Sequence, residues 1–180
     1  ANPFPISFEV FSDDLSEMYR QALLLSKIGE NVVIKIPITN TQGISTSKIA
    51  QSLNESGLRL NITAIMTDHQ LETFLSDMDK NAENIYSIFA GRVADTGRDP
   101  IPIMKRAKSL LVSFPNSKLL WASPREILNV YQANDLGVDI VTLTSNLFNK
   151  LNLRDKDLVK YSLETVDMFY RDAQESGFVL

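Results

Sequence analysis

The sequence alternates strand-like and helix-like stretches six times, and this alternation limits the possible folds more than any other feature. Short runs rich in Val, Ile, Leu and aromatic residues predict strands, and apolar residues at helical spacing follow each run. Repeated strand–helix pairs are typical of right-handed βαβ units around a parallel sheet. The predicted strands cover residues 6–10, 32–39, 58–65, 85–90, 118–122 and 139–144.

The pattern favours an α/β fold of the (β/α)8 TIM-barrel type, with about six βα units present in this chain. No glycine-rich phosphate loop follows any predicted strand, which weakens the case for a doubly wound nucleotide-binding fold. The length of 180 residues suits one domain with a substantial core. We therefore expect a single barrel domain over residues 1–180, with a C-terminal helix and tail over residues 161–180.

Capping residues predict where several helices begin. Ser12 is the expected cap of the first helix, and Thr67 with Gln70 has the form of a capping box. The segment Ser123–Glu126 predicts another helix start, and Ser162 is expected to open the last long helix. Residues 91–99 are predicted to form a long polar loop.

Composition excludes several functional classes. A net charge of −4 without a basic tract argues against a nucleic-acid partner, and no apolar run approaches the ~18 residues of a membrane span. The chain has no cysteine and one histidine, His69, so a catalytic triad or a cysteine or multi-histidine metal site is excluded. We expect His69 to be a solvated helix residue. The N-terminus shows no signal-peptide pattern, and we expect a cytoplasmic protein.

A lysine lies within the most apolar predicted strand. Five of the eight residues in 32–39 are Val or Ile, and Lys35 is in their midst. Burial of an uncompensated ammonium is costly and lowers the pKa of the amine, which makes it a nucleophile towards carbonyls. Pro37 should mark the end of the strand and so place Lys35 near its carboxyl end, where barrels form their sites. The alternative is an edge strand with Lys35 directed into water.

Polar residues recur on one parity of successive predicted strands. Alternate strand residues share a face, so each strand can direct one set of side chains to the same side. This interpretation predicts a site that lines a barrel mouth. The candidates are Glu9, Lys35, Asn61 with Thr63, Ser87 with Phe89, and Trp121 with Ser123.

Four segments in order resemble one family. Residues 32–39 resemble a Schiff-base lysine strand, and residues 60–63 resemble an Asn-x-Thr strand. Residues 87–95 are similar to a Ser-x-Phe-x-Gly-Arg motif, and residues 122–125 to an Ala-Ser-x-Arg phosphate segment. On these segments the chain is identified as a member of the transaldolase family of class I lysine aldolases, from the third βα unit of the barrel to the C-terminus.

The resemblance implies transfer of a dihydroxyacetone unit between phosphorylated sugars in the pentose phosphate pathway, without metal or cofactor. Lys35 would form the imine, and Glu9 with Thr63 would relay protons through a water. Asn61, Ser87 and Phe89 would contact the substrate. The implied phosphate ligands are Arg92, Ser123 and Arg125, although Ser123 could instead cap a helix. The implied partners are phosphorylated sugars, and we expect a homo-oligomer.

Two alternatives stay open. The fructose-6-phosphate aldolase branch resembles a pattern with Gln at position 9 and Tyr at position 89, whereas this chain has Glu9 and Phe89, as on the transaldolase side. The other alternative is a non-catalytic phosphosugar-binding fragment. It arises because the family's first two strands carry an acid/base Asp and a Thr-Thr-Asn-Pro motif, and neither is found in residues 1–180. We expect a gap at that seam, or another chain filling it, and little or no transaldolase activity from these residues alone.

Overall fold

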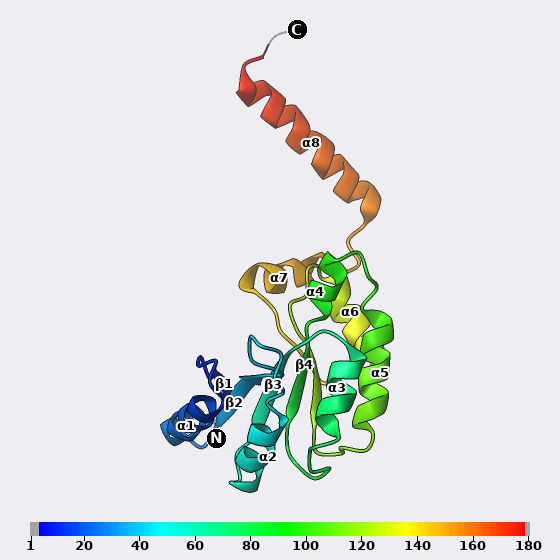
Figure 1. Ribbon diagram of the computed structural model, residues 1–180. Coiled ribbons are helices and arrows are strands. Elements are labelled where there is room, and N and C mark those ends of the chain that lie inside the picture. Colours follow the sequence, from blue (N-terminus) through cyan, green and yellow to red (C-terminus); the bar gives the residue numbers. More distant parts are fainter. Residues whose placement is uncertain (1–3, 179–180) are drawn as a thin grey trace. The chain divides into compact units, whose positions relative to one another are not determined.

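Strands and helices alternate along the chain as the sequence predicts. The computed structural model describes residues 4–178 (Figure 1). Its strands are β1 (Ile6–Glu9), β2 (Val32–Pro37), β3 (Leu60–Ile65), β4 (Ile85–Ile88), β5 (Lys118–Trp121) and β6 (Ile140–Val141). Its α-helices are α1 (Leu15–Leu25), α2 (Ser47–Glu55), α3 (Asp68–Leu75), α4 (Ala90–Asp95), α5 (Ile101–Leu111), α6 (Leu128–Asp135), α7 (Ser145–Lys150) and α8 (Leu158–Ser176), with 3-10 turns η1 (Ser26–Ile28) and η2 (Leu151–Leu153).

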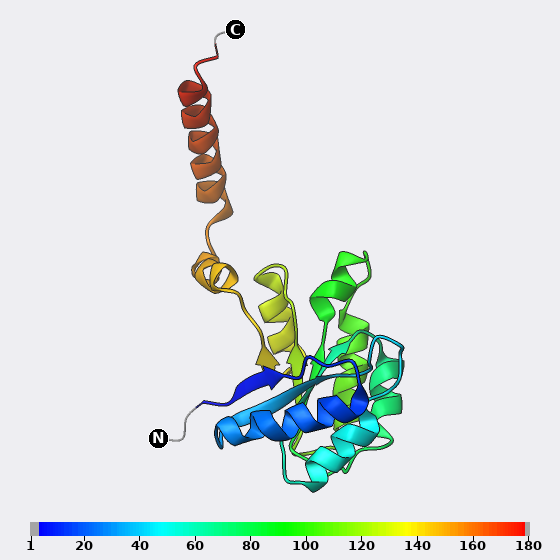
Figure 2. The same ribbon diagram turned by 60° about the vertical axis from the view of Figure 1, so that its left-hand side comes forward.

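The strands form one parallel sheet in chain order, β1-β2-β3-β4-β5-β6. The sheet curls, with α1 and α2 outside it (Figure 2). This arrangement confirms the predicted partial (β/α)8 barrel. Since β2 pairs with both β1 and β3, the alternative of an edge strand bearing Lys35 is wrong.

The sheet has two open edges. Among residues 4–178, β1 pairs only with β2 and β6 only with β5, and no ladder joins β1 to β6. Within this chain the seam between β1 and β6 is therefore open, and whether another chain fills it stays a prediction.

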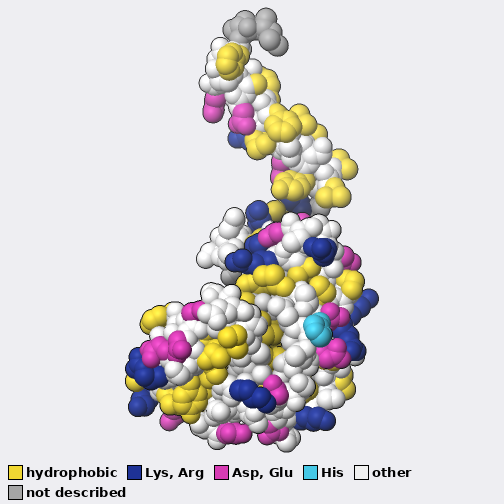
Figure 3. Space-filling model, viewed as in Figure 1, with side chains coloured by type: hydrophobic (Ala, Val, Ile, Leu, Met, Phe, Trp, Pro, Cys, Tyr) yellow, Lys and Arg dark blue, Asp and Glu magenta, His cyan; other side chains and the backbone are white. Residues whose placement is uncertain are grey.

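The core lies between the sheet and its helices. Outward-facing strand residues such as Ile34, Ile62 and Tyr86 are fully or almost fully buried, and the Phe74 ring of α3 packs edge-on against Tyr86 at a centroid distance of 6.5 Å. Burial of these side chains is the main favourable term that holds the helices on the sheet. His69, the cyan side chain in Figure 3, is exposed on α3, as expected.

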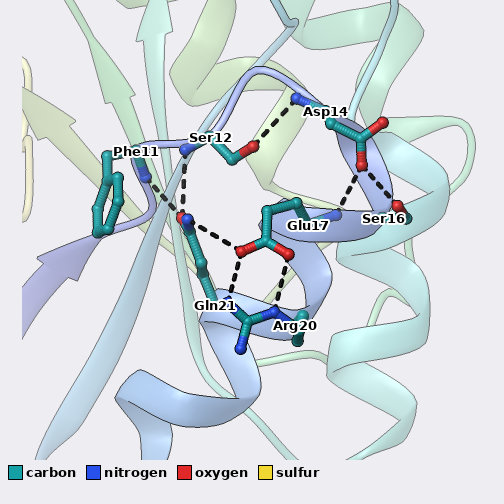
Figure 4. A network of polar contacts seen from close by, with 7 residues as sticks. All are labelled: Phe11, Ser12, Asp14, Ser16, Glu17, Arg20 and Gln21. Carbon is teal, nitrogen blue, oxygen red and sulfur yellow. Dashed lines mark hydrogen bonds and ion pairs between the residues drawn. The ribbon is translucent and has the colours of Figure 1, made fainter.

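Local hydrogen bonds fix the turn between β1 and α1 (Figure 4). The buried side chain of Gln21 accepts from the backbone N–H groups of Phe11 and Ser12 at 3.0 and 3.2 Å. Asp14 caps α1 by accepting from the Glu17 N–H at 2.8 Å, so the predicted cap at Ser12 is wrong. The Ser12 hydroxyl instead accepts from the Asp14 N–H at 3.2 Å, one step before the helix.

Residues 144–178 form a separate compact unit from residues 4–143. Asp157 caps α8 through the Lys160 N–H, so this helix begins at Leu158 and not at the predicted Ser162. No residue of α8 is buried, and Figure 3 shows apolar side chains exposed along it. Within residues 4–178, no helix combines the length and apolar character that crossing a membrane requires. The single domain over residues 1–180 stays a prediction.

Candidate functional site

Three charged or polar side chains lie side by side on the inner face of the sheet. The register pairs Glu9 with Lys35 and Lys35 with Asn61 across β1, β2 and β3. The Lys35 Nζ lies 3.0 Å from the Glu9 Oε2, and the two side chains are 28% and 49% exposed. The ammonium is thus compensated by a carboxylate, and the expectation of an uncompensated buried lysine is wrong.

A hydrogen-bonded chain crosses the interior beside this pair. The Ser87 hydroxyl on β4 donates to the Asn61 Oδ1 at 2.7 Å, and the Asn61 Nδ2 donates to the Ser7 Oγ on β1 at 3.2 Å. Asn61 and Ser87 are buried. Both ends of the Asn61 amide therefore have protein partners, which fixes its orientation, and one amide hydrogen is left over to donate to a ligand.

Thr63 lies near a distortion of β3. Ala64 has a φ of 63°, and the β3–β4 register shifts between Ile62 and Ile65. The Thr63 hydroxyl is buried without a hydrogen-bond partner among the described residues. Buried hydroxyls normally find a partner, so this oxygen is suited to hold a water or a ligand group.

The fifth strand does not supply the polar residue expected of it. Ser87 pairs with Leu120, and Ile88 pairs with Trp121. Leu120 therefore shares the inner face with Ser87, while Trp121 shares the outer face with Ile88 and is fully buried there. Ser123 lies beyond the end of β5, so the parity predicted for Trp121 and Ser123 does not apply to it.

Residues 90–95 form the helix α4, although a strand was predicted to end at residue 90 and a polar loop to cover residues 91–99. Ala90, Gly91 and Val93 are buried, and their tertiary contacts explain why a segment without strong helix signals is helical. The Arg92 guanidinium lies 5.5 Å from the centre of the Phe89 ring, a cation–π contact that links two candidate substrate ligands.

Ser123 does not cap a helix. It has a left-handed φ of 57°, and its N–H donates to the Thr142 Oγ1 at 3.3 Å. The next helix, α6, begins at Leu128, so the helix start predicted at Ser123–Glu126 is wrong. The buried side chain of Asn129 explains the delay, because its Oδ1 accepts from the N–H groups of Arg125 and Glu126 at 2.8 and 3.2 Å.

The α4 segment and the loop after β5 are in close backbone contact. The Gly91 N–H donates to the Ala122 carbonyl at 3.2 Å, and a Cβ at Gly91 would lie 1.5 Å from the Ser123 carbonyl oxygen. Only glycine allows this approach. Arg125 also binds Asp95 of α4 in an ion pair. Arg92, Ser123 and Arg125 thus belong to one cluster, which we call the arginine cradle: Arg92, Asp95, Ser123 and Arg125.

Sequence reasoning gave no role to two residues of these clusters. Ser7 shares its strand face with Glu9, and this i, i+2 spacing was the available signal. Asp95 lies one helical turn after Arg92, but a loop prediction for residues 91–99 hides that relation. Among the described residues, no three His, Asp or Glu side chains lie close enough together to hold a metal ion.

Comparison with known proteins places the chain in a family. The family model described as Transaldolase/Fructose-6-phosphate aldolase matches residues 1–179. Proteins named probable transaldolase from Thermoanaerobacter sp. (strain X514) and Chelativorans sp. (strain BNC1) are 35% and 30% identical over 177 and 176 residues, which is 96% of this chain and 74% of each relative. A third, from Nitrosopumilus maritimus (strain SCM1), is 32% identical over 148 residues, or 81% of this chain and 63% of that relative.

The chain therefore spans only part of the length of these relatives. The match over nearly all of its residues nonetheless shows that the chain belongs to the transaldolase/fructose-6-phosphate aldolase family.

Proposed function

We propose that this chain forms a transaldolase site in which Lys35 binds a ketose phosphate covalently as an imine. The observation that supports it best is the Lys35–Glu9 pair at 3.0 Å on the inner face, with Asn61 in register beside it. A lysine and a carboxylate at hydrogen-bond distance supply both the nucleophile and the base that the first step requires.

The chemistry can be assigned to these residues. Glu9 accepts a proton from the Lys35 ammonium, and the free amine adds to the ketose carbonyl and expels water to form the imine. The imine accepts the electron pair of the C3–C4 bond as the C4 hydroxyl loses its proton, so an aldose phosphate leaves and a dihydroxyacetone enamine remains on Lys35. The Thr63 hydroxyl, buried without a protein partner, suits a water that relays these protons. The enamine carbon then adds to the carbonyl of an acceptor aldehyde, whose oxygen takes a proton, and water hydrolyses the new imine to release the ketose phosphate from Lys35.

Binding is assigned to the residues around this centre. Asn61, Ser87 and Phe89 contact the sugar, and the arginine cradle holds its phosphate through Arg92, Ser123 and Arg125. Two guanidinium groups suit this role because their planar N–H forks match phosphate oxygens. With this activity we propose a role in the pentose phosphate pathway, a cytoplasmic location and a homo-oligomeric protein.

An aldolase that releases free dihydroxyacetone is the second candidate, because the matching family includes both activities. Glu9 and Phe89 favour the transaldolase. The two differ in what happens to the three-carbon unit: a transaldolase retains it until an acceptor arrives, whereas an aldolase releases it into water.

Single-turnover assays separate these activities. The open edges of the sheet lead us to expect slow turnover, so the protein is used in excess over fructose 6-phosphate. We expect glyceraldehyde 3-phosphate to appear, and no free dihydroxyacetone unless acceptor is withheld for long periods. Addition of erythrose 4-phosphate should yield the transferred ketose. Release of dihydroxyacetone at the rate of cleavage would favour the aldolase, and the absence of cleavage in either assay would refute both activities.

A further inference from the structure

The arginine cradle contains a carboxylate that an anion site would be expected to exclude. The Asp95 Oδ1 accepts from the Arg125 Nε at 2.8 Å, and its Oδ2 accepts from the same Nε at 3.1 Å and from the Nη2. Both side chains are about half exposed, at 50% and 48%. Exposed ion pairs contribute little to stability, so stability alone gives no reason for a negative charge here.

The contact leaves part of the guanidinium available. Asp95 takes the Nε and Nη2 of Arg125, whereas the Nη1 makes no hydrogen bond to another residue in the described range. A guanidinium can bind two oxyanions along different edges of its plane, because its five N–H groups lie in a rigid fork. One edge of the Arg125 guanidinium is thus held by Asp95, and the other edge is available to a ligand.

The backbone on both sides of this contact is fixed. Gly91 is pressed against the Ser123 carbonyl, and Asn129 holds the N–H groups of Arg125 and Glu126. Asp95 comes from α4, one turn after Arg92, and it is the only described residue to which the Arg125 side chain makes a hydrogen bond. The Arg125 guanidinium holds the pKa of the Asp95 carboxyl below its usual range, and the charge of Arg92 acts in the same direction. Asp95 therefore stays charged at neutral pH.

We propose that Asp95 is a positioning residue that sets the specificity of this site for phosphorylated sugars. By holding the Nε edge of Arg125, Asp95 directs the Nη1 edge towards the phosphate. It also restricts the arginine to few rotamers before the ligand arrives, so less conformational entropy is lost when phosphate binds. The gain from orientation exceeds the repulsion between the carboxylate and the phosphate. This inference rests on the proposed function, in which Arg125 is a phosphate ligand.

The test measures binding of inorganic phosphate to the whole chain by titration calorimetry, so it does not depend on turnover. Asp95→Asn keeps the shape of the side chain and removes its charge, and we expect phosphate affinity to fall about tenfold, as for a lost charge-assisted contact. Asp95→Glu should restore part of it. Asp77→Asn is the matched control, since it removes an equal charge from a separate ion pair, that of Asp77 with Lys48, and should leave affinity unchanged.

A double mutant separates positioning from a general structural role. In an Arg125→Ala background, Asp95→Asn should have no further effect, because the group that it orients is gone. An additive loss there, or phosphate affinity equal to or above that of the unmutated chain in Asp95→Asn, would overturn the inference while leaving Arg125 a phosphate ligand. If Arg125→Ala itself does not alter phosphate affinity, the phosphate site of the proposed function fails as well.

Discussion

At the scale of single residues, polar contacts between neighbouring strands hold the side chains on the inner face of the sheet in place. Lys35 is paired with Glu9, and Asn61 is held at both ends by Ser7 and Ser87. These contacts follow from strand register, because three neighbouring strands place residues of the same parity at the same level. Two predictions concern residues of β4, one facing inwards and one outwards.

Ser87→Ala should lower the free energy of unfolding by about 1–3 kcal/mol, because it leaves the buried Asn61 Oδ1 without a donor. Ser7→Ala removes a longer, partly buried hydrogen bond from an exposed residue and is the matched control, with an expected loss below about 1 kcal/mol. Urea unfolding of both variants checks this. Equal stability of Ser87→Ala and the unmutated chain would mean that the hydroxyl does not support Asn61.

Tyr86 should make stability depend on alkaline pH. Burial raises the pKa of its phenol to about 12, and this effect outweighs the opposing effect of Asn84. The unfolded chain ionises near pH 10, so Tyr86 favours the folded state fully below that pH, and its contribution is lost between about pH 10 and 12, by up to about 2–3 kcal/mol.

Tyr86→Phe isolates this effect from the other groups that titrate at high pH. It should remove the loss of stability that Tyr86 causes between about pH 10 and 12, and it should cost little at pH 7, because the hydroxyl has no partner to lose. Parallel pH dependences of the two proteins in urea unfolding would contradict the assignment.

At the scale of elements, the sequence was informative where the signals are local. The capping box of Thr67 and Gln70 forms as predicted, and every predicted strand is present with ends shifted by a few residues. The predictions are wrong where tertiary contacts determine the local structure. Burial of Ala90, Gly91 and Val93 makes α4 helical, and Asn129 together with the left-handed Ser123 delays α6. Which residue of β5 faces the inner side depends on the register between β4 and β5, and the sequence does not show that register.

Gly91→Ala should damage the arginine cradle. Alanine is the better helix former by about 1 kcal/mol, but its Cβ would lie 1.5 Å from the Ser123 carbonyl oxygen, so backbone must move. We expect the cost of this clash to exceed the gain in helix propensity, with a net loss of about 2–3 kcal/mol in the free energy of unfolding and weaker phosphate binding. Thermal unfolding and phosphate titration measure both.

Gly97→Ala is the control for this substitution. Gly97 has a φ of 78° and open space around its Cβ position, so alanine should cost about 1 kcal/mol of backbone strain and leave phosphate affinity unchanged. If Gly91→Ala binds phosphate as well as Gly97→Ala does, the close approach of Gly91 and Ser123 is not needed for the cradle.

At the scale of the whole molecule, the open edges of the sheet are the main structural liability of residues 4–143. β1 and β6 each present unpaired backbone groups, and Ile6 on β1 is exposed. Such edges favour association with other strands. We expect the apparent mass by light scattering to rise with protein concentration and Ile6→Lys to reduce that rise. Val112→Lys adds the same charge at an exposed position at the C-terminal end of α5, and it should not reduce the rise in apparent mass. Equal behaviour of both variants would exclude β1 as the associating edge.

The central claim is that Lys35 forms an imine with the ketose, and reductive trapping tests it most directly. The protein is incubated with fructose 6-phosphate and borohydride, digested and mapped by mass spectrometry. We predict one three-carbon adduct, on Lys35. Lys35→Arg keeps the charge beside Glu9 but cannot form the imine, and it should give no adduct. Labelling of another lysine, or of none under conditions where the protein is folded, would contradict the claim.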